Sequence, residues 1–215
     1  MQRTRAVRIF GLTGGIASGK SSVAAHWRSR GLPVLDADAL AREAVAPGSE
    51  GLSEIVRAFG SDLLEGGALN RKELGRRVFG DKDQLLRLEA ITHPRIEALR
   101  KQRLGELGAR GEPLACAEIP LLFEKNMEAE LRPIVLVSVP EALQLERAQR
   151  RDGSPSSELQ ARIAAQLPLG EKRARADYVI DNRGSLDELR AAADGVLTQI
   201  CRSVGVPPAR YGLPG

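Results

Sequence analysis

Short apolar runs alternate with amphipathic stretches along this chain. Five of these runs are predicted strands: residues 7–12, 32–35, 113–119, 133–139 and 178–180. The run at 134–139 is continuous and rich in β-branched residues, which is typical of a strand covered on both faces. Because helical patterns separate the strands, the order favours an α/β fold with a five-stranded, mainly parallel sheet flanked by helices.

Helices are predicted at 20–29, at 141–151, in the stretch ending at Gln166, and after Ser185 to about Val204. Ser185 with Glu188 three residues later is a capping-box pattern. Helical segments also dominate from Ala39 to about Arg110, and glycines and Pro94 punctuate them. An insertion of about 70 residues between two strands often builds a substrate site over their carboxyl ends.

Composition places the chain among ordinary globular proteins. Its 215 residues are 42% hydrophobic and 28% charged, which excludes a disordered chain, a collagen-like fibre and a disulfide-rich miniature protein. Aromatic residues make up only 3%, too few for a stacking surface that binds single-stranded nucleic acid. The net charge of +4 fits anionic small molecules, and we expect no nucleic-acid partner.

Membrane, metal and disulfide signals are weak. No apolar stretch reaches 18 residues, so we expect no membrane-spanning helix and no membrane partner. The apolar run after the basic N-terminus is too short for a signal peptide, which leaves the cytoplasm as the expected location. Cys116 and Cys201 lack metal-ligand spacing, and Cys116 lies in an apolar run typical of a buried thiol.

One motif carries specific chemistry. Residues 14–21, GGIASGKS, match G-x-x-x-x-G-K-[ST], between a predicted strand and a predicted helix. Such a loop turns backbone N–H groups toward an anion at a helix N-terminus. Lys20 can then reach the β- and γ-phosphates of a nucleoside triphosphate, and the Ser21 hydroxyl can ligate Mg²⁺. The predicted nucleotide-binding residues are Gly14, Gly15, Ile16, Ala17, Ser18, Gly19, Lys20, Ser21 and Ser22.

The rest of the chain favours a small phosphotransferase over other nucleotide-binding proteins. A GTPase needs an N-K-x-D motif, which is absent, and the D-x-x-G match at 181–184 lies too late in the chain for a switch loop. We interpret that match as a turn at the end of a strand. No apolar run ends in a clear Asp-Glu pair, which disfavours a large motor ATPase.

A basic segment spans residues 147–175 and includes Arg147, Arg151 and Arg162. It could close over a triphosphate, exclude water and stabilise the transferring group, with residues 152–155 as a hinge. The alternative is a pair of helices whose charges are merely solvated.

Two further groups of residues have open roles. Asp36 and Asp38 follow the second predicted strand, where alternation would point both the same way. A carboxylate there can accept the proton of an attacking hydroxyl or hold hydrated Mg²⁺, but Asp38 could equally cap a helix. His93 before Pro94 reads as a turn or helix boundary, or as a contact for an anionic acceptor.

Taken in order, these residues resemble the dephospho-coenzyme A kinase family over roughly residues 7–204. The phosphate loop is generic, but the ordered set is specific. Its other members are the acidic pair at 36–38, the His93–Pro94 step, the segment PLLFE at 120–124, Arg147 with Arg151 and Asp152, Arg162 to Gln166, and Asp177 through Gly184.

The resemblance implies ATP-dependent phosphorylation of the ribose 3′-hydroxyl of dephospho-coenzyme A, with Mg²⁺ as cofactor. It also implies a P-loop kinase fold with a nucleotide-binding core, a helical acceptor region and a lid. By matching positions, Asp38 becomes the general base, Asp36 its partner near the metal, and Arg147 a lid residue approaching the phosphates. His93, Leu121 and Leu122 become parts of the acceptor pocket.

These expectations place the core at 1–38, 112–142 and 168–206, the acceptor region at 39–111 and the lid at 143–167. The tail at 207–215 is rich in Pro and Gly and is expected to fray. We expect a monomer, since no heptad pattern is evident. A kinase for a nucleoside or nucleoside monophosphate, and a regulatory nucleotide-binding module, remain alternatives.

One position departs from the family. The family usually has Gly where this chain has Ala17. If that residue needs a positive φ, Ala costs about 1 kcal/mol, which predicts a small adjustment and retained binding.

Overall fold

The computed structural model describes residues 6–78, 80–153 and 155–215. Met1–Arg5, in the predicted core, and Ser154, in the predicted hinge, lie outside the described residues. The chain divides into two compact units. We call them the sheet unit, Met1–Leu35 with Leu107–Gly215, and the helical unit, Asp36–Glu106.

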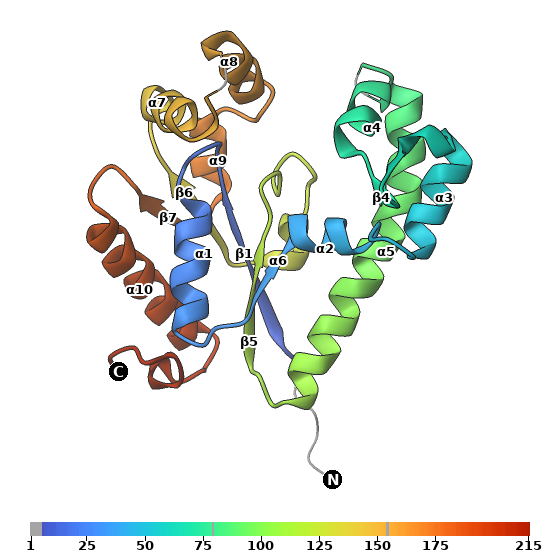
Figure 1. Ribbon diagram of the computed structural model, residues 1–215. Coiled ribbons are helices and arrows are strands. Elements are labelled where there is room, and N and C mark those ends of the chain that lie inside the picture. The colour runs from blue at the N-terminus through green and yellow to red at the C-terminus, as the bar shows by residue number, and fades with distance from the viewer. Residues whose placement is uncertain (1–5, 79, 154) are drawn as a thin grey trace. The chain divides into compact units, whose positions relative to one another are not determined.

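The sheet unit is built on a five-stranded sheet with the order β2-β5-β1-β6-β7 (Figure 1). The strands are β1 (Arg8–Gly14), β2 (Val34–Asp36), β5 (Leu114–Glu118), β6 (Ile134–Ser138) and β7 (Tyr178–Asp181). β1 pairs in parallel with both β5 and β6, and β6 pairs in parallel with β7. β5 and β6 are buried over their whole length, as strands covered on both faces must be. The five predicted strands are confirmed.

Helices connect and cover these strands: α1 (Lys20–Ser29), α6 (Glu128–Leu131), α7 (Glu141–Asp152), α8 (Ser156–Ala164), α9 (Leu169–Arg175) and α10 (Leu186–Ser203). The capping box of Ser185 and Glu188 at the start of α10 is confirmed. α6 and α9 were not expected from the sequence. Both span two turns or fewer, which is too short for an apolar face to show its helical period.

The core of the sheet unit lies where α1 and α10 pack side by side against the sheet (Figure 1). Trp27 of α1 stands edge-on to Phe10 of β1, with ring centroids 5.5 Å apart. Its indole N–H donates to the carbonyl oxygen of Ala193 in α10 at 3.1 Å. The only Trp of the chain therefore joins all three elements, with its polar atom satisfied as burial requires.

The prediction that residues 207–215 fray is wrong. Pro208–Tyr211 form a 3₁₀ turn, and Tyr211 and Leu213 belong to the core, each with 3% or less of its surface exposed. Arg30 donates to the carbonyl oxygen of Gly212 at 3.1 Å, and burial raises the pKa of Tyr211 to about 12. Two large apolar side chains among the prolines and glycines are enough to hold the segment on the core.

The helical unit contains α2 (Ala37–Glu43), α3 (Glu50–Phe59), α4 (Arg71–Val78) and most of α5 (Lys82–Ala109), with a 3₁₀ turn at Ser61–Leu63. It also holds a small antiparallel hairpin of β3 (Leu64–Glu65) and β4 (Ala68–Leu69), which the sequence analysis did not predict. Gly66 and Gly67 both have positive φ, as a two-residue hairpin turn demands. The two adjacent glycines were the signal in the sequence from which this hairpin could have been predicted.

Pro94 does not end a helix, contrary to the reading of His93–Pro94 as a turn or boundary. It lies inside α5, which runs continuously for 28 residues. Ile91 and Ile96, on either side of it, pack against the same apolar cluster of the helical unit. Burial on both sides of the proline offsets the roughly 3 kcal/mol that an interior proline costs a helix.

Tyr211→Ala is expected to lower the free energy of unfolding by about 3 kcal/mol, because it leaves a cavity in the core. Pro214→Ala, at an exposed position of the same tail, should change it little. Urea denaturation of both variants measures the difference. Equal stability of the two variants would contradict the packing of this tail.

Candidate functional site

The loop between β1 and α1 has a backbone that only small residues permit. A Cβ at Gly14 would lie 2.4 Å from Ser18 Oγ and 2.7 Å from the carbonyl oxygen of Val137. Gly19 has a φ of 91°, and a Cβ there would lie 2.2 Å from the amide nitrogen of Asn182. Both glycines of the motif are therefore required by close approach, and the curl they permit turns the loop toward an anion.

Ala17 adopts a left-handed conformation with a φ of 52°. This position therefore needs a positive φ, and Ala17 stands where the family usually has Gly. The alanine carries a strain of about 1 kcal/mol that glycine would not. The fold around the loop holds this residue in place despite the strain.

Asn182 supports the loop from the end of β7. Its side-chain amide donates to the carbonyl oxygen of Ser18 at 2.8 Å, and its backbone N–H donates to Ser138 at the end of β6. The residue is only 7% exposed. The interpretation of residues 181–184 as a turn at a strand end is confirmed, since β7 ends at Asp181, but the role of the Asn182 amide was not predicted. Asparagine directly after an apolar strand was the only signal.

Lys20 rests against a carboxylate. Its Nζ lies 2.6 Å from Glu118 Oε1, and Arg28 lies 3.3 Å from Glu118 Oε2. Glu118 is 3% exposed, and two cations satisfy it there. Because β5 is the neighbour of β1, its last residue lies beside the start of α1. Sequence reasoning missed Glu118 because it looked for a paired acidic motif and extended the strand to 119.

Ser18 Oγ is a buried polar atom that has no hydrogen-bond partner among the described residues. It lies within the curled loop, close to Gly14. Ser21 and Ser22, at the first turn of α1, are exposed. Buried polar atoms in native proteins are nearly always satisfied, so an orphaned hydroxyl at this place is consistent with a ligand of the loop.

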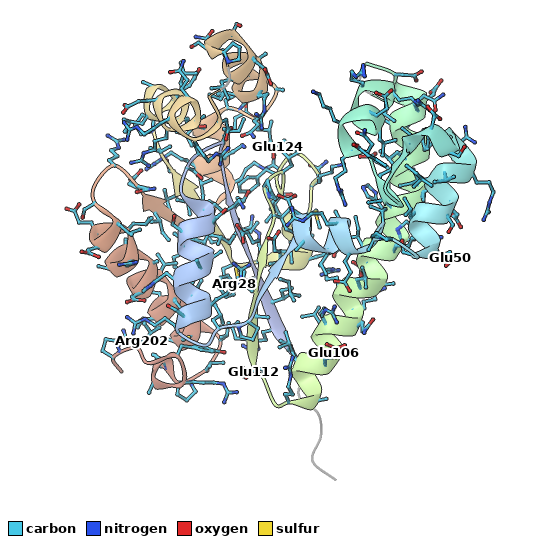
Figure 2. The ribbon with its side chains drawn as sticks, in the orientation of Figure 1. Arg28, Glu50, Glu106, Glu112, Glu124 and Arg202 are labelled. Atoms are coloured by element: carbon cyan, nitrogen blue, oxygen red, sulfur yellow. The ribbon has the colours of Figure 1, made fainter. Side chains whose placement is uncertain are left out.

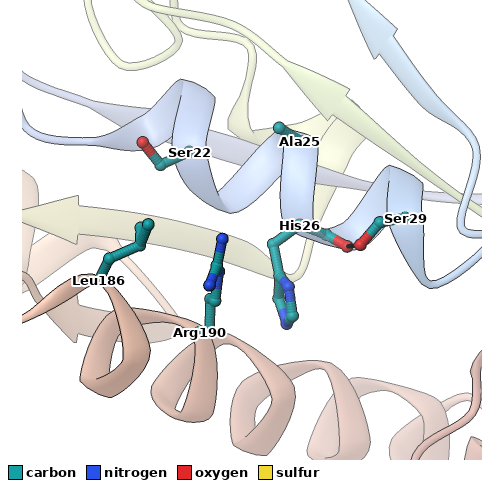
Figure 3. Close-up of a pocket in the computed structure, with 6 residues that line it drawn as sticks. All are labelled: Ser22, Ala25, His26, Ser29, Leu186 and Arg190. Carbon is teal, nitrogen blue, oxygen red and sulfur yellow. Dashed lines mark hydrogen bonds between the residues drawn. The ribbon is translucent and has the colours of Figure 1, made fainter.

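Ser22 also lies at one end of an open groove of about 520 Å³ between α1 and α10 (Figure 3). Its other lining residues are Ala25, His26, Ser29, Leu186 and Arg190. His26 Nε2 lies 2.7 Å from Asp194 Oδ1, and Arg30 pairs with the same carboxylate. The hydrogen bond of His26 and the ion pair of Arg30 join α1 and its C-cap to α10, which gives these side chains a structural role.

The basic segment 147–175 divides into two parts. Lys172 is buried, and Arg173 and Arg175 pair with Asp181 and Glu128, so these three residues of α9 are structural cations. The predicted lid, 143–167, comprises most of α7 and all of α8. Within it Arg150, Arg151 and Arg162 have acidic neighbours at 3.9 Å or less.

Arg147 differs from those lid arginines because no described residue accepts a hydrogen bond from it or pairs with it. It lies one helical turn after Gln144, whose Oε1 would lie 2.6 Å from a Cβ at Gly15 of the phosphate loop. Arg147 as a residue is half-buried. Among the described lid arginines it is the one whose charge is available to a ligand.

Asp36, Asp38 and His93 lie in the helical unit. Asp36, not Asp38, caps α2: its Oδ1 accepts from the N–H groups of Asp38 and Ala39. The expected strand alternation of the two aspartates is also wrong, because Ala37 already begins the helix. Asp38 is exposed in the first turn, which leaves its carboxylate free of the capping role.

The two leucines predicted for the acceptor pocket differ. Leu121 is 39% exposed, whereas Leu122 is fully buried and lies against Gly11. The Leu122 side chain therefore presents no surface to a ligand here, and its contact with an acceptor stays a prediction. His93 is exposed in the middle of α5, with its Nε2 3.8 Å from Glu89.

No group of three or more potential metal ligands occurs among the described residues. Ser21 and Glu118 supply oxygen donors within the sheet unit, and Asp36 supplies another in the helical unit. Oxygen donors are the ligands that Mg²⁺ prefers.

Among the described residues, no helix is long and apolar enough to cross a membrane. Cys116 is fully buried, and this burial raises its pKa, as expected for an inert thiol.

Comparison with known proteins gives a consistent family. A model of the dephospho-CoA kinase family matches residues 8–188. A dephospho-CoA kinase from Anaeromyxobacter dehalogenans (strain 2CP-C) is 49% identical over 95% of this chain and 100% of its own length. One from Arabidopsis thaliana is 42% identical over 91% of this chain and 85% of its own length.

Solved structures agree with these matches. TT1252 from Thermus thermophilus has a TM-score of 0.81 at 42% identity, covering 91% of this chain and 99% of its own. The dephospho-CoA kinase from Campylobacter jejuni has a TM-score of 0.66 at 29% identity, covering 91% of this chain and 98% of its own.

Asn182→Ala is expected to weaken ATP binding about tenfold, because Ser18 loses its partner and the loop loses a buried hydrogen bond. Arg183→Ala, at the adjacent exposed position, is the control and should bind normally. Fluorescence titration with a labelled ATP analogue measures both affinities. Unchanged affinity in Asn182→Ala would show that the loop keeps its shape without this support.

Proposed function

The chain belongs to the dephospho-CoA kinase family, and from this premise we propose that it transfers the γ-phosphoryl group of ATP to the ribose 3′-hydroxyl of dephospho-coenzyme A. The products are coenzyme A and ADP. The observation that carries the proposal is the complete phosphate loop, held between Gly14, Gly19 and Asn182, in a chain of which residues 8–188 match the family model.

Phosphate binding falls to the loop backbone and Lys20. The N–H groups of the loop and the N-terminus of α1 favour a polyanion. Lys20 is 2.6 Å from Glu118, so it exchanges one anionic partner for another when a triphosphate enters. Lys20 therefore keeps an anionic partner throughout, and the Glu118 carboxylate is left facing the phosphates of the nucleotide.

Mg²⁺ is the cofactor that this reaction implies, and the donor set fits it. Ser21 would hold the ion, Glu118 would act on it directly or through water, and Asp36 would contribute its second oxygen, since only Oδ1 is used in capping. When bound, the ion neutralises charge that develops on the phosphates.

Asp38 is the proposed general base. A general base for this reaction must be free to accept the proton of the attacking hydroxyl, and a carboxylate can do so. Asp38 has no capping bond to give up, whereas Asp36 has two. His93 and Leu121 are proposed to contact the acceptor.

The lid is proposed to close by bringing Arg147 to the phosphates. Closure would exclude water and stabilise charge on the transferring group. The free guanidinium of Arg147 and the position of α7 beside Gly15 support this role. We further propose that the protein acts as a monomer in the cytoplasm, which gel filtration and cell fractionation would test.

A kinase for nucleosides or nucleoside monophosphates is the alternative. Release of ADP from ATP and Mg²⁺, with each candidate acceptor in turn, separates the two. Dephospho-coenzyme A should raise the rate strongly and nucleoside monophosphates should not. A reversed preference would contradict the proposed substrate, and no dependence on any acceptor would favour a regulatory module.

Asp38→Asn is expected to keep ATP binding but to lower kcat by about 10²–10⁴-fold, the usual contribution of a positioned base. Asp83→Asn is a matched control, since Asp83 also lies exposed in the first turn of a helix of the same unit. Steady-state ADP release measures both. Near-normal turnover of Asp38→Asn would remove Asp38 as the base.

Arg147→Ala is expected to lower kcat about 10²-fold or more, because the charge it supplies acts in the transition state. Arg150→Ala removes an exposed arginine of the same helix that already pairs with Glu146, and it should change the rate little. If both variants reacted at the same rate, Arg147 would have no special position in the lid.

A further inference from the structure

A largely buried carboxylate, Glu124, joins the loop after β5 to the end of the lid. Glu124 Oε1 accepts from the N–H of Leu167 at 3.0 Å and lies 2.8 Å from Lys172 Nζ (Glu124 is labelled in Figure 2). Lys172 also donates to Gln166 Oε1 at 3.2 Å. We call Glu124, Gln166, Leu167 and Lys172 the Glu124 clamp.

The two charges of the clamp are paired through Glu124 Oε1, while Glu124 Oε2 is buried without a hydrogen-bond partner among the described residues. Lys172 is 2% exposed. Burial alone would raise the pKa of Glu124, but the hydrogen bonds from Lys172 and Leu167 outweigh it and hold that pKa below its usual range. Removing either charge alone would strand the other in a buried place. The pair therefore holds its two segments in one arrangement.

The base of the clamp is fixed by a second set of contacts. Arg175, one turn after Lys172, donates to the carbonyl oxygen of Phe123 and lies over the Phe123 ring at 5.0 Å. It also pairs with Glu128. α9 is thus held to residues 123–128 at two places, and its start at Leu169 directly follows the lid.

The clamp faces the phosphate loop. A cavity of about 240 Å³ is lined by Gly15 of the loop, by Gln144 at the start of α7, and by Gln166 and Lys172. Gln144 donates to the carbonyl oxygen of Val139, which holds the first end of the lid to the strand end. Both ends of the lid therefore lie beside Gly15. Glu124 holds the C-terminal end, at Gln166 and Leu167.

We propose that Glu124 and Lys172 are positioning residues that fix the second end of the lid, so that α7 and α8 close about a fixed point and carry Arg147 to the phosphates. The inference rests on the proposed function. It assigns a role to Glu124, the last residue of the PLLFE segment, which neither the phosphate loop nor the acidic pair explains. The same loop carries the exposed Leu121, so the acceptor-facing segment and the lid share one support.

The test replaces the ion pair without leaving a buried charge. In Glu124→Gln with Lys172→Met, the amide oxygen can still accept from Leu167, and no charge is stranded, so the variant is expected to fold. The matched control is Glu146→Gln with Arg150→Met, which removes an exposed pair within α7. Thermal unfolding of both double variants verifies the fold, and the single variants Glu124→Gln and Lys172→Met complete the cycle.

For the clamp variant, kcat should fall about tenfold or more while KM for dephospho-coenzyme A stays within about threefold, as for an interaction made only in the transition state. ATP hydrolysis without acceptor should rise relative to transfer, because a loose lid admits water. The control variant should show neither change. A folded clamp variant with wild-type kcat and wild-type coupling would overturn the proposal and leave the pair a purely structural one.

Hydrogen exchange of the lid amides separates this outcome from failure of the proposed function. Addition of ATP and Mg²⁺ should protect residues 143–167 in the wild type and in the control variant, and much less in the clamp variant. This readout does not depend on which acceptor the enzyme uses. Equal protection in all three proteins would overturn the role of the clamp even if transfer to dephospho-coenzyme A proceeds.

Discussion

The inward curl of the loop between β1 and α1 is the constraint on which the sheet unit depends. Its backbone must leave N–H groups unpaired for a ligand, so the remaining polar groups need partners from elsewhere. One such partner comes from a neighbouring strand end, since Asn182 follows β7 and donates to the carbonyl oxygen of Ser18. With β1 central, the parallel sheet brings the ends of β6 and β7 to the same edge as the loop.

Two largely buried lysine–glutamate pairs lie at that edge. Glu118 ends β5 and holds Lys20, and Glu124, six residues later, holds Lys172. Charges in such surroundings cost much unless they are paired, so each pair fixes the position of the segments that carry it. In the roles proposed above, Lys20 exchanges Glu118 for a phosphate of the bound nucleotide, whereas Glu124 and Lys172 stay paired and hold the end of the lid.

The helical unit shows how one local bond changes the interpretation of a motif. Asp36 uses one oxygen to cap α2, and this choice removes Asp38 from capping and places it exposed in the first turn. Two aspartates that look equivalent in sequence therefore have different chemistry: one is held by backbone N–H groups, and the other is free to accept a proton. α5 shows a similar effect, because burial on both sides of Pro94 overrides the helix-breaking tendency of the proline.

The sequence by itself determined the five strands, the parallel sheet and the phosphate loop, because strand periodicity and glycine placement are local and depend on few neighbours. It also identified the family through the order of its motifs. Only the tertiary structure decided that Glu118 faces Lys20, that Asn182 holds Ser18, that Leu122 is buried and that Tyr211 and Leu213 belong to the core. Those facts depend on which residues distant in sequence become neighbours, and a hydrophobic pattern read along one chain carries no record of such pairings.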